Sequence, residues 1–74
     1  MTQYEIVWHY IGDPRPVVHP FPSLAEAEAF WAELMSQAAA LEVNDAVLHR
    51  LVRRSGRPGE VFAGDAVKQW RRSE

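Results

Sequence analysis

The hydrophobic and polar positions of this chain change period along its length, and each period predicts a different element. Between residues 23 and 41 the apolar side chains recur at spacings of three and four, the pattern of one helix face. The stripe consists of Leu24, Ala27, Trp31, Leu34, Ala38 and Leu41, widened by Phe30 and Met35. Its interior has no glycine or proline, so helix propensity agrees with periodicity. We therefore predict a long helix over about residues 23–40.

Ser23 is the predicted start of this helix. Its hydroxyl can accept a hydrogen bond from the backbone N–H of Glu26, and the Glu26 carboxylate can accept one from the backbone N–H of Ser23. This reciprocal capping box is typical of a helix N-terminus. It locates the helix and carries no chemistry of its own.

Residues 3–11 alternate with a period of two, in β-branched and aromatic types that suit a strand. One side of the strand carries Tyr4, Ile6, Trp8 and Tyr10, and the other carries Glu5, Val7, His9 and Ile11. Residues 12–16, Gly-Asp-Pro-Arg-Pro, predict a turn, and residues 17–19 a short returning strand. Because Pro20 and Pro22 cannot donate to a ladder, this second strand must be an edge strand or end there.

Residues 44–54 fit two different elements. The apolar positions Val47, Leu48, Leu51 and Val52 form one helix face, with Asn44 or Asp45 as the cap and Gly56 as the terminator. The same segment also fits a strand, with Leu48 and Val52 on one face and Val47 and Leu51 on the other. We prefer the strand, because residues 55–59 are typical of a hairpin loop leading into 60–62 and because one helix needs a sheet to cover.

The C-terminal segment predicts a second, short helix. Gly64-Asp65 can cap residues 66–72, whose Ala66, Val67 and Trp70 then face one way while Lys68, Arg71 and Arg72 face solvent near the negative end of the helix dipole. The predicted order is ββαββα. This is an α+β fold in which the long helix lies on one face of a small antiparallel sheet, within a single domain spanning residues 1–74.

Composition narrows the class of protein. A chain of 74 residues buries too little surface to be very stable, and without cysteine it has neither disulfides nor thiolate metal sites. Self-association is the remaining way to gain stability, and a reducing cytoplasm is the expected location. The N-terminus lacks the charged and apolar regions of a secretion signal, and no window is apolar enough to span a membrane. We expect a small soluble cytoplasmic protein, of bacterial or phage type.

Charge is unevenly distributed around a net value of −2. Residues 1–37 carry five acids and one base, whereas residues 38–74 carry five acids and seven bases. The second half can attract an anion through Arg50, Arg53, Arg54 and Arg57, joined by Lys68, Arg71 and Arg72, with Tyr4, Trp8 or Tyr10 stacking on bases. The alternation of side chains along a strand argues against a single basic patch, because Arg50 and Arg54 would point to one face and Arg53 to the other. A charged hairpin that protects a sheet edge is the simpler interpretation.

Three histidines, His9, His19 and His49, fall on three different predicted strands, and three imidazoles can ligate zinc. If Gly12 pairs with Val17 in the first hairpin, His19 lies opposite Tyr10 and faces away from His9. The chain also lacks the short ligand pairs of known metal motifs. We therefore predict no metal and no cofactor.

The two faces of the predicted sheet differ in role. The long helix needs an apolar face, so the row from Tyr4 to Tyr10 is assigned to the core. The other face then offers more apolar surface than one helix can cover, and its members are Val7, His9, Ile11, Val47 and Leu51. The short helix with Trp70, a second copy of the chain or another protein could cover it.

The chain shows no paired carboxylates, no nucleophile beside a base and no phosphate-binding loop. We expect a non-catalytic protein–protein interaction module that self-associates as a homodimer through the exposed sheet face. The alternative is a nucleic-acid-binding module that uses the arginine-rich hairpin around residues 50–57. The remaining exception to a non-catalytic role is an activity that depends on histidine or on a metal.

Overall fold

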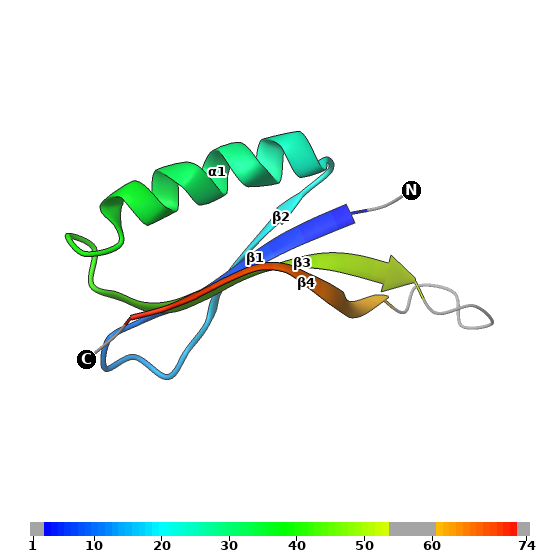
Figure 1. Ribbon diagram of the computed structural model, residues 1–74. Coiled ribbons are helices and arrows are strands. Elements are labelled where there is room, and N and C mark those ends of the chain that lie inside the picture. The colour runs from blue at the N-terminus through cyan, green and yellow to red at the C-terminus, as the bar shows by residue number, and fades with distance from the viewer. Residues whose placement is uncertain (1–2, 54–60, 73–74) are drawn as a thin grey trace.

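The computed structural model describes residues 3–53 and 61–72, which form a four-stranded antiparallel sheet with one helix on one of its faces (Figure 1). The elements are β1 (Gln3–Tyr10), β2 (Val17–Phe21), α1 (Leu24–Gln37), β3 (Val43–Arg53) and β4 (Val61–Arg71). The strand order in the sheet is β2-β1-β3-β4. The predicted α+β class is confirmed, and the chain order is ββαββ.

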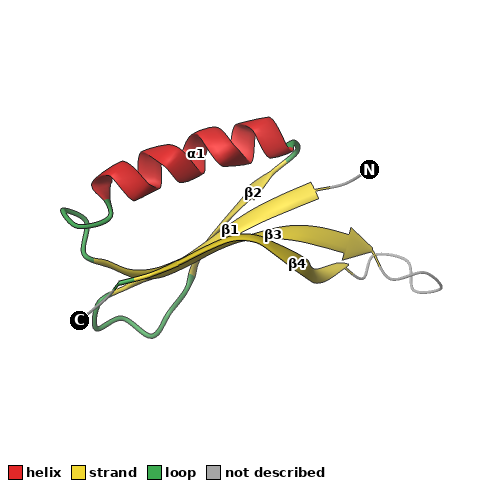
Figure 2. Cartoon of the chain, viewed as in Figure 1, coloured by secondary structure: helices red, strands yellow, loops and turns green. Residues whose placement is uncertain are grey.

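The predicted C-terminal helix over residues 66–72 is wrong, because residues 66–71 belong to β4 and Arg72 follows its end (Figure 2). A seven-residue helix is too short to be stable without extensive packing. As a strand, the same residues pair with β3, and Trp70 lies opposite Ala46 on the helix side of the sheet. Trp70 therefore packs against the main core instead of covering the second face.

The preference for a strand is confirmed over residues 44–53 by β3, which pairs with both β1 and β4, and residue 54 lies outside the described residues. Leu48 lies opposite Ile6, and both side chains are completely buried. Val47, the preceding residue, lies opposite Val7 and points to the other face. The predicted division of β3 between two faces is thus observed at Val47 and Leu48.

The first hairpin has a longer loop than predicted. His19 pairs with Ile6, and the last pair of the hairpin is Trp8 with Val17. Residues 11–16 form the loop between the two strands. The predicted pairing of His19 with Tyr10 is wrong by four residues. Because a shift by an even number of residues preserves the face, His19 still points away from His9, as predicted. β2 is an edge strand and contains Pro20, which is consistent with the proline rule.

The helix begins as predicted, but only half of the capping box forms. The Ser23 hydroxyl oxygen accepts a hydrogen bond from the backbone N–H of Glu26 at 3.3 Å. The Glu26 carboxylate accepts a hydrogen bond from the Ser23 hydroxyl at 3.2 Å, instead of one from the Ser23 backbone. The helix ends at Gln37, three residues before the predicted limit of 40.

A Schellman-type turn over residues 38–43 leads the chain from α1 into β3. The backbone N–H of Val43 donates to Ala38 O at 3.0 Å, and that of Glu42 donates to Ala39 O at 3.3 Å. Glu42 has a positive φ of 59°, at the position where glycine is usual. Leu41 lies in this turn and is 43% exposed, so its predicted place in the buried helix stripe is wrong.

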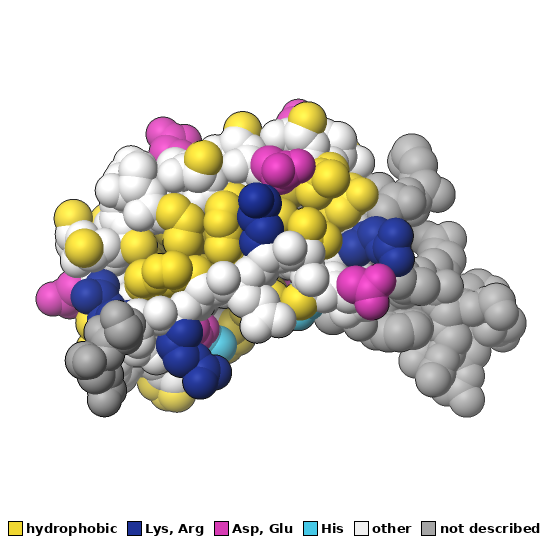
Figure 3. Space-filling model, viewed as in Figure 1, with side chains coloured by type: hydrophobic (Ala, Val, Ile, Leu, Met, Phe, Trp, Pro, Cys, Tyr) yellow, Lys and Arg dark blue, Asp and Glu magenta, His cyan; other side chains and the backbone are white. Residues whose placement is uncertain are grey.

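The hydrophobic core lies between α1 and the sheet, where Figure 3 shows the hydrophobic side chains gathered between the two layers. The assignment of the Ile6 and Trp8 side of β1 to the core is confirmed, since both residues are buried. The helix contributes Ala27, Trp31 and Leu34 to the same core. The buried apolar residues are Ile6, Trp8, Phe21, Ala27, Trp31, Leu34, Ala38, Val43, Ala46 and Leu48.

Candidate functional site: the open face of the sheet

The face of the sheet opposite α1, which we call the open face, is not covered by any helix within residues 3–53 and 61–72 (Figures 1 and 2). α1 packs against β1 and β2 from the other side. β4 extends the sheet in its own plane, so it widens the open face instead of shielding it. The side chains of this face stand in rows across the strands.

The central row of the open face is apolar on three strands. Val7 of β1 lies opposite Val18 of β2 on one side and opposite Val47 of β3 on the other. We call Val18, Val7 and Val47 the valine row. Val18 is 50% exposed, and the other two are half-buried by their neighbours in the sheet. Gln69 of β4 ends the row, opposite Val47.

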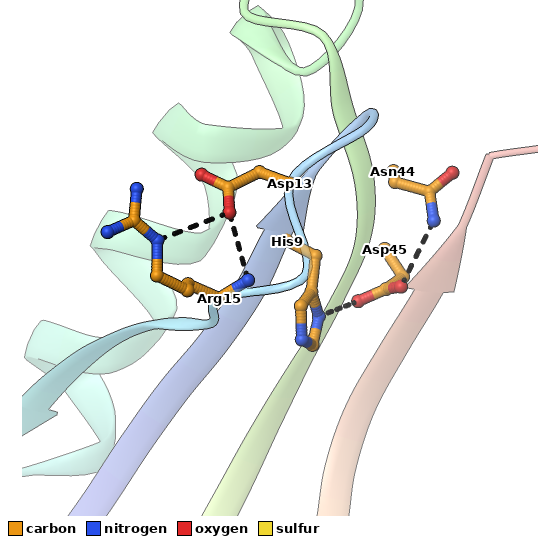
Figure 4. A network of polar contacts seen from close by, with 5 residues as sticks. All are labelled: His9, Asp13, Arg15, Asn44 and Asp45. Carbon is orange, nitrogen blue, oxygen red and sulfur yellow. Dashed lines mark hydrogen bonds and ion pairs between the residues drawn. The ribbon is translucent and has the colours of Figure 1, made fainter.

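A polar row lies on one side of the valine row. His9, Asp45 and Arg71 follow one another across β1, β3 and β4. Figure 4 shows the His9 and Asp45 side chains turned toward each other, with His9 Nδ1 2.8 Å from Asp45 Oδ1. The second carboxylate oxygen of Asp45 accepts a hydrogen bond from Asn44 Nδ2 at 3.3 Å. Both partners of the His9–Asp45 pair are about one-third exposed, at 35% and 34%.

A β-bulge at Asn44 places Asp45 on this face. His9 lies opposite Asp45, but the next residue of β1, Tyr10, lies opposite Val43, so β3 holds one extra residue. The extra residue reverses the alternation of side chains between the two faces of β3. Val43 therefore points into the core, whereas Asp45, two residues later, points to the open face. The backbone N–H of Arg72 donates to the carbonyl oxygen of Asn44 at 2.9 Å.

A second polar row lies on the other side of the valine row. Glu5 of β1 is opposite His49 of β3, and both are half-buried. The Nδ1 atom of His49 is buried and has no hydrogen-bond partner among the described residues. Pro20 of β2 and Ala66 of β4 complete the row. The open face therefore has an apolar centre between two rows that each carry one carboxylate and one or more basic side chains.

The residues predicted for an interaction face divide into two groups. Val7, His9, Val47 and Leu51 all lie on the open face. Ile11 lies outside β1, in the turn that follows it, where its backbone N–H donates to Glu42 O at 2.8 Å. Val18, Asp45 and Gln69 also lie on this face and were not predicted, because their positions depend on strand register.

The basic residues of the described segments are dispersed. Arg50 lies on the helix side of the sheet, where its Nη2 is 3.1 Å from Asp65 Oδ2. Lys68 Nζ is 3.9 Å from Glu28 Oε2 on α1. Arg71 belongs to the open face. Arg54 and Arg57 lie outside the described residues, as does the side chain of Arg53, so the predicted arginine patch stays a prediction.

The histidines do not combine into a metal site in the part of the chain that the structure describes. His9 and His49 share the open face, whereas His19 lies on the helix side and stacks on Phe21 with ring centroids 4.4 Å apart. No group of three or more histidine, aspartate or glutamate side chains within residues 3–53 and 61–72 is placed to hold a metal ion.

Two hollows of about 460 and 680 Å³ lie on either side of Asp45. The smaller is lined by His9, Tyr10, Gly12, Asp13, Pro14, Asn44 and Asp45, and the larger by Asp45, Ala46, Val47, Gln69, Trp70 and Arg71. Asp13 accepts a hydrogen bond from the backbone N–H of Arg15 at 2.9 Å and is turned toward that residue (Figure 4). Neither lining includes a serine, threonine or cysteine that His9 could activate.

No protein-family model matches the chain, and neither a curated protein nor a solved structure matches it. Within the described residues, the helix is neither long nor apolar enough to cross a membrane.

Proposed function

We propose that this chain is a non-catalytic protein–protein interaction module whose contact surface is the open face. The partner is a protein, either a second copy of the chain or another chain, and the setting is cytoplasmic, which suits a sequence without cysteine. The observation that carries the proposal is the valine row, which crosses three strands on a face that no described helix covers.

Energetics support a contact at this face. A sheet needs a second layer on each apolar face, and α1 supplies that layer on one side only. Among the residues whose side chains are described, Val18 is one of four large hydrophobic residues that are strongly exposed, and it continues the half-buried pair of Val7 and Val47. Contiguous apolar patches with polar rims mark protein interaction sites on soluble domains. The rows of His9 and Glu5 provide such a rim.

The proposal is tested by light scattering at micromolar concentration together with a fluorescent dye that binds exposed apolar surface. The chain is expected to self-associate or, as a monomer, to bind the dye through the open face. Val18→Glu should reduce either signal, because it places a charge on the valine row. Leu41→Glu is the matched control, since Leu41 is similarly exposed at 43% but lies in the turn after α1. A monomer that does not bind the dye contradicts the proposal.

Nothing in the described residues favours the nucleic-acid alternative over this one. Arg50 is already paired with Asp65, and Arg71 lies on the opposite face of the sheet from Arg50. Phosphate binding by the hairpin would show as a steep loss of affinity with salt.

A further inference from the structure

We infer that the occupant of the open face is a second copy of this chain, packed face to face about a two-fold axis that runs along the valine row. This inference rests on the proposed function, because it names the partner at the same surface. A two-fold interface brings the same patch of both subunits together and requires that the patch complement itself. The open face meets this requirement in its apolar centre and in its two polar rows.

The apolar centre complements itself by position. A two-fold axis along the valine row places Val18, Val7 and Val47 of one copy over the same residues of the other. Gln69 then meets Gln69, so the polar end of the row is not buried against an apolar side chain. Two sheets packed in this way have nearly aligned strands and interdigitating side chains, the usual geometry of a β-sandwich.

The polar rows complement each other by their hydrogen-bonding groups. The same axis exchanges the two sides of the valine row, so the row of His9 and Asp45 faces the row of Glu5 and His49 of the second copy. Glu5 then meets His9, and Asp45 meets His49, so that each carboxylate faces a basic side chain. In this arrangement no carboxylate faces another. A carboxylate accepts hydrogen bonds and an imidazole can donate one, so this orientation is favoured over one that brings two carboxylates together.

The edges of the sheet are less suited to joining two copies. β2 has only five residues and contains Pro20, which cannot donate to a further strand. β4 has two register irregularities in its pairing with β3, and it carries the charged residues Asp65, Lys68 and Arg71. Irregular pairing and charge are the means by which natural sheets protect an edge from further pairing.

The size of the face predicts a weak dimer. Four strands spaced by about 4.8 Å, with about eight residues of about 3.3 Å each, give a face of roughly 500 Å² per copy. Two copies would bury on the order of 1,000 Å², at the lower end of the range for specific interfaces. We therefore expect a dissociation constant in the micromolar range, accessible to sedimentation equilibrium.

Cysteine crosslinking tests the arrangement directly, because the chain has no natural cysteine. Val7→Cys places a thiol beside the proposed axis, so a short thiol-to-thiol crosslinker should join two copies efficiently. Ala32→Cys, on the exposed side of α1, is the matched control and should not crosslink at the same concentration. Lys68→Cys, on the helix side of the edge strand β4, faces away from the proposed interface and reports on edge-to-edge pairing instead. In sedimentation equilibrium, Val18→Glu should weaken the dimer about tenfold or more, and Leu41→Glu should leave it unchanged.

The outcomes separate the two proposals. Crosslinking of Val7→Cys without that of Ala32→Cys, together with dissociation by Val18→Glu, supports the two-fold dimer. Crosslinking of Lys68→Cys in place of Val7→Cys overturns it in favour of edge pairing. A chain that stays monomeric at a protein concentration 100-fold or more above the expected micromolar dissociation constant also overturns the dimer. If that monomer binds the dye, and Val18→Glu does not, the open face remains a docking site for a different protein.

Discussion

The Arg72 side chain donates a hydrogen bond from Nη2 to the carbonyl oxygen of Ala38, 3.1 Å away, and so links the end of β4 to the end of α1. Its Nε donates a second hydrogen bond to Val43 O at 2.9 Å. The guanidinium thus binds backbone carbonyls on both sides of the turn that joins the helix to β3. A positive charge at this place also complements the negative end of the helix dipole.

Replacing Arg72 should destabilise the fold. Arg72→Met keeps much of the aliphatic chain but removes one donor from each of two carbonyl oxygens, with Ala38 O keeping its hydrogen bond from the Val43 N–H, and it should lower the free energy of unfolding by about 1–3 kcal/mol. Urea denaturation at a fixed protein concentration measures the change. Arg15→Met is the control, because the Arg15 side chain is 89% exposed and should change stability by less than about 0.5 kcal/mol. Equal effects of the two substitutions would contradict this role of Arg72.

Glu42 is the residue whose replacement should stabilise the chain. Its φ of 59° is a left-handed conformation that costs a non-glycine residue about 1–2 kcal/mol. Glu42→Gly should therefore raise the free energy of unfolding by about 0.5–1 kcal/mol, after allowance for the greater freedom of glycine in the unfolded chain. Ala39→Gly, in the same turn, should instead lower stability by a similar amount. Thermal denaturation of both variants checks the prediction, and a loss of stability in Glu42→Gly would refute it.

Ser23 should contribute more to stability than the second serine of the helix. Ser23→Ala removes the acceptor for the Glu26 N–H and should cost about 1 kcal/mol. Ser36→Ala removes only a hydroxyl that donates to Glu33 O, already within the helix, and should change stability by less than about 0.5 kcal/mol. Helical circular dichroism and urea denaturation together report the difference.

Adjacent residues of β3 should respond very differently to truncation. Leu48→Ala creates a cavity in the core and should lower the free energy of unfolding by about 2–5 kcal/mol, whereas Val47→Ala on the open face should cost about 1 kcal/mol or less. If the proposed dimer forms, Val47→Ala should cause an additional loss of stability, which appears only at protein concentrations where the wild type is dimeric. Concentration-dependent melting curves measure both effects.

The elements whose hydrophobic positions follow a single period could be predicted from the sequence. The helix stripe around Trp31 and the alternation around Trp8 each match one period over many residues, and both are observed. The segment around Trp70 matches two periods over seven residues, and only pairing with β3 decides between them. The turn at Glu42 has no glycine, so the usual signal for the end of a helix was missing.

The candidate site was predictable only in part. The presence of Val7 and Val47 on a second apolar face follows from alternation. The pairing of His9 with Asp45 joins residues that are 36 positions apart, and it depends on the register of β1 and β3. Val18 depends in the same way on the length of the first hairpin loop, which the turn residues alone do not determine.

The extra residue at Asn44 also affects how this chain must be compared with others. On the N-terminal side of Asn44 the odd-numbered Val43 is buried, and on its C-terminal side the buried positions are the even-numbered Ala46 and Leu48. A related sequence without the bulge would align with this one only if a single-residue gap were placed at position 44. An ungapped alignment would offset the two chains by one residue on one side of Asn44, and there it would match core residues with the open face of this protein.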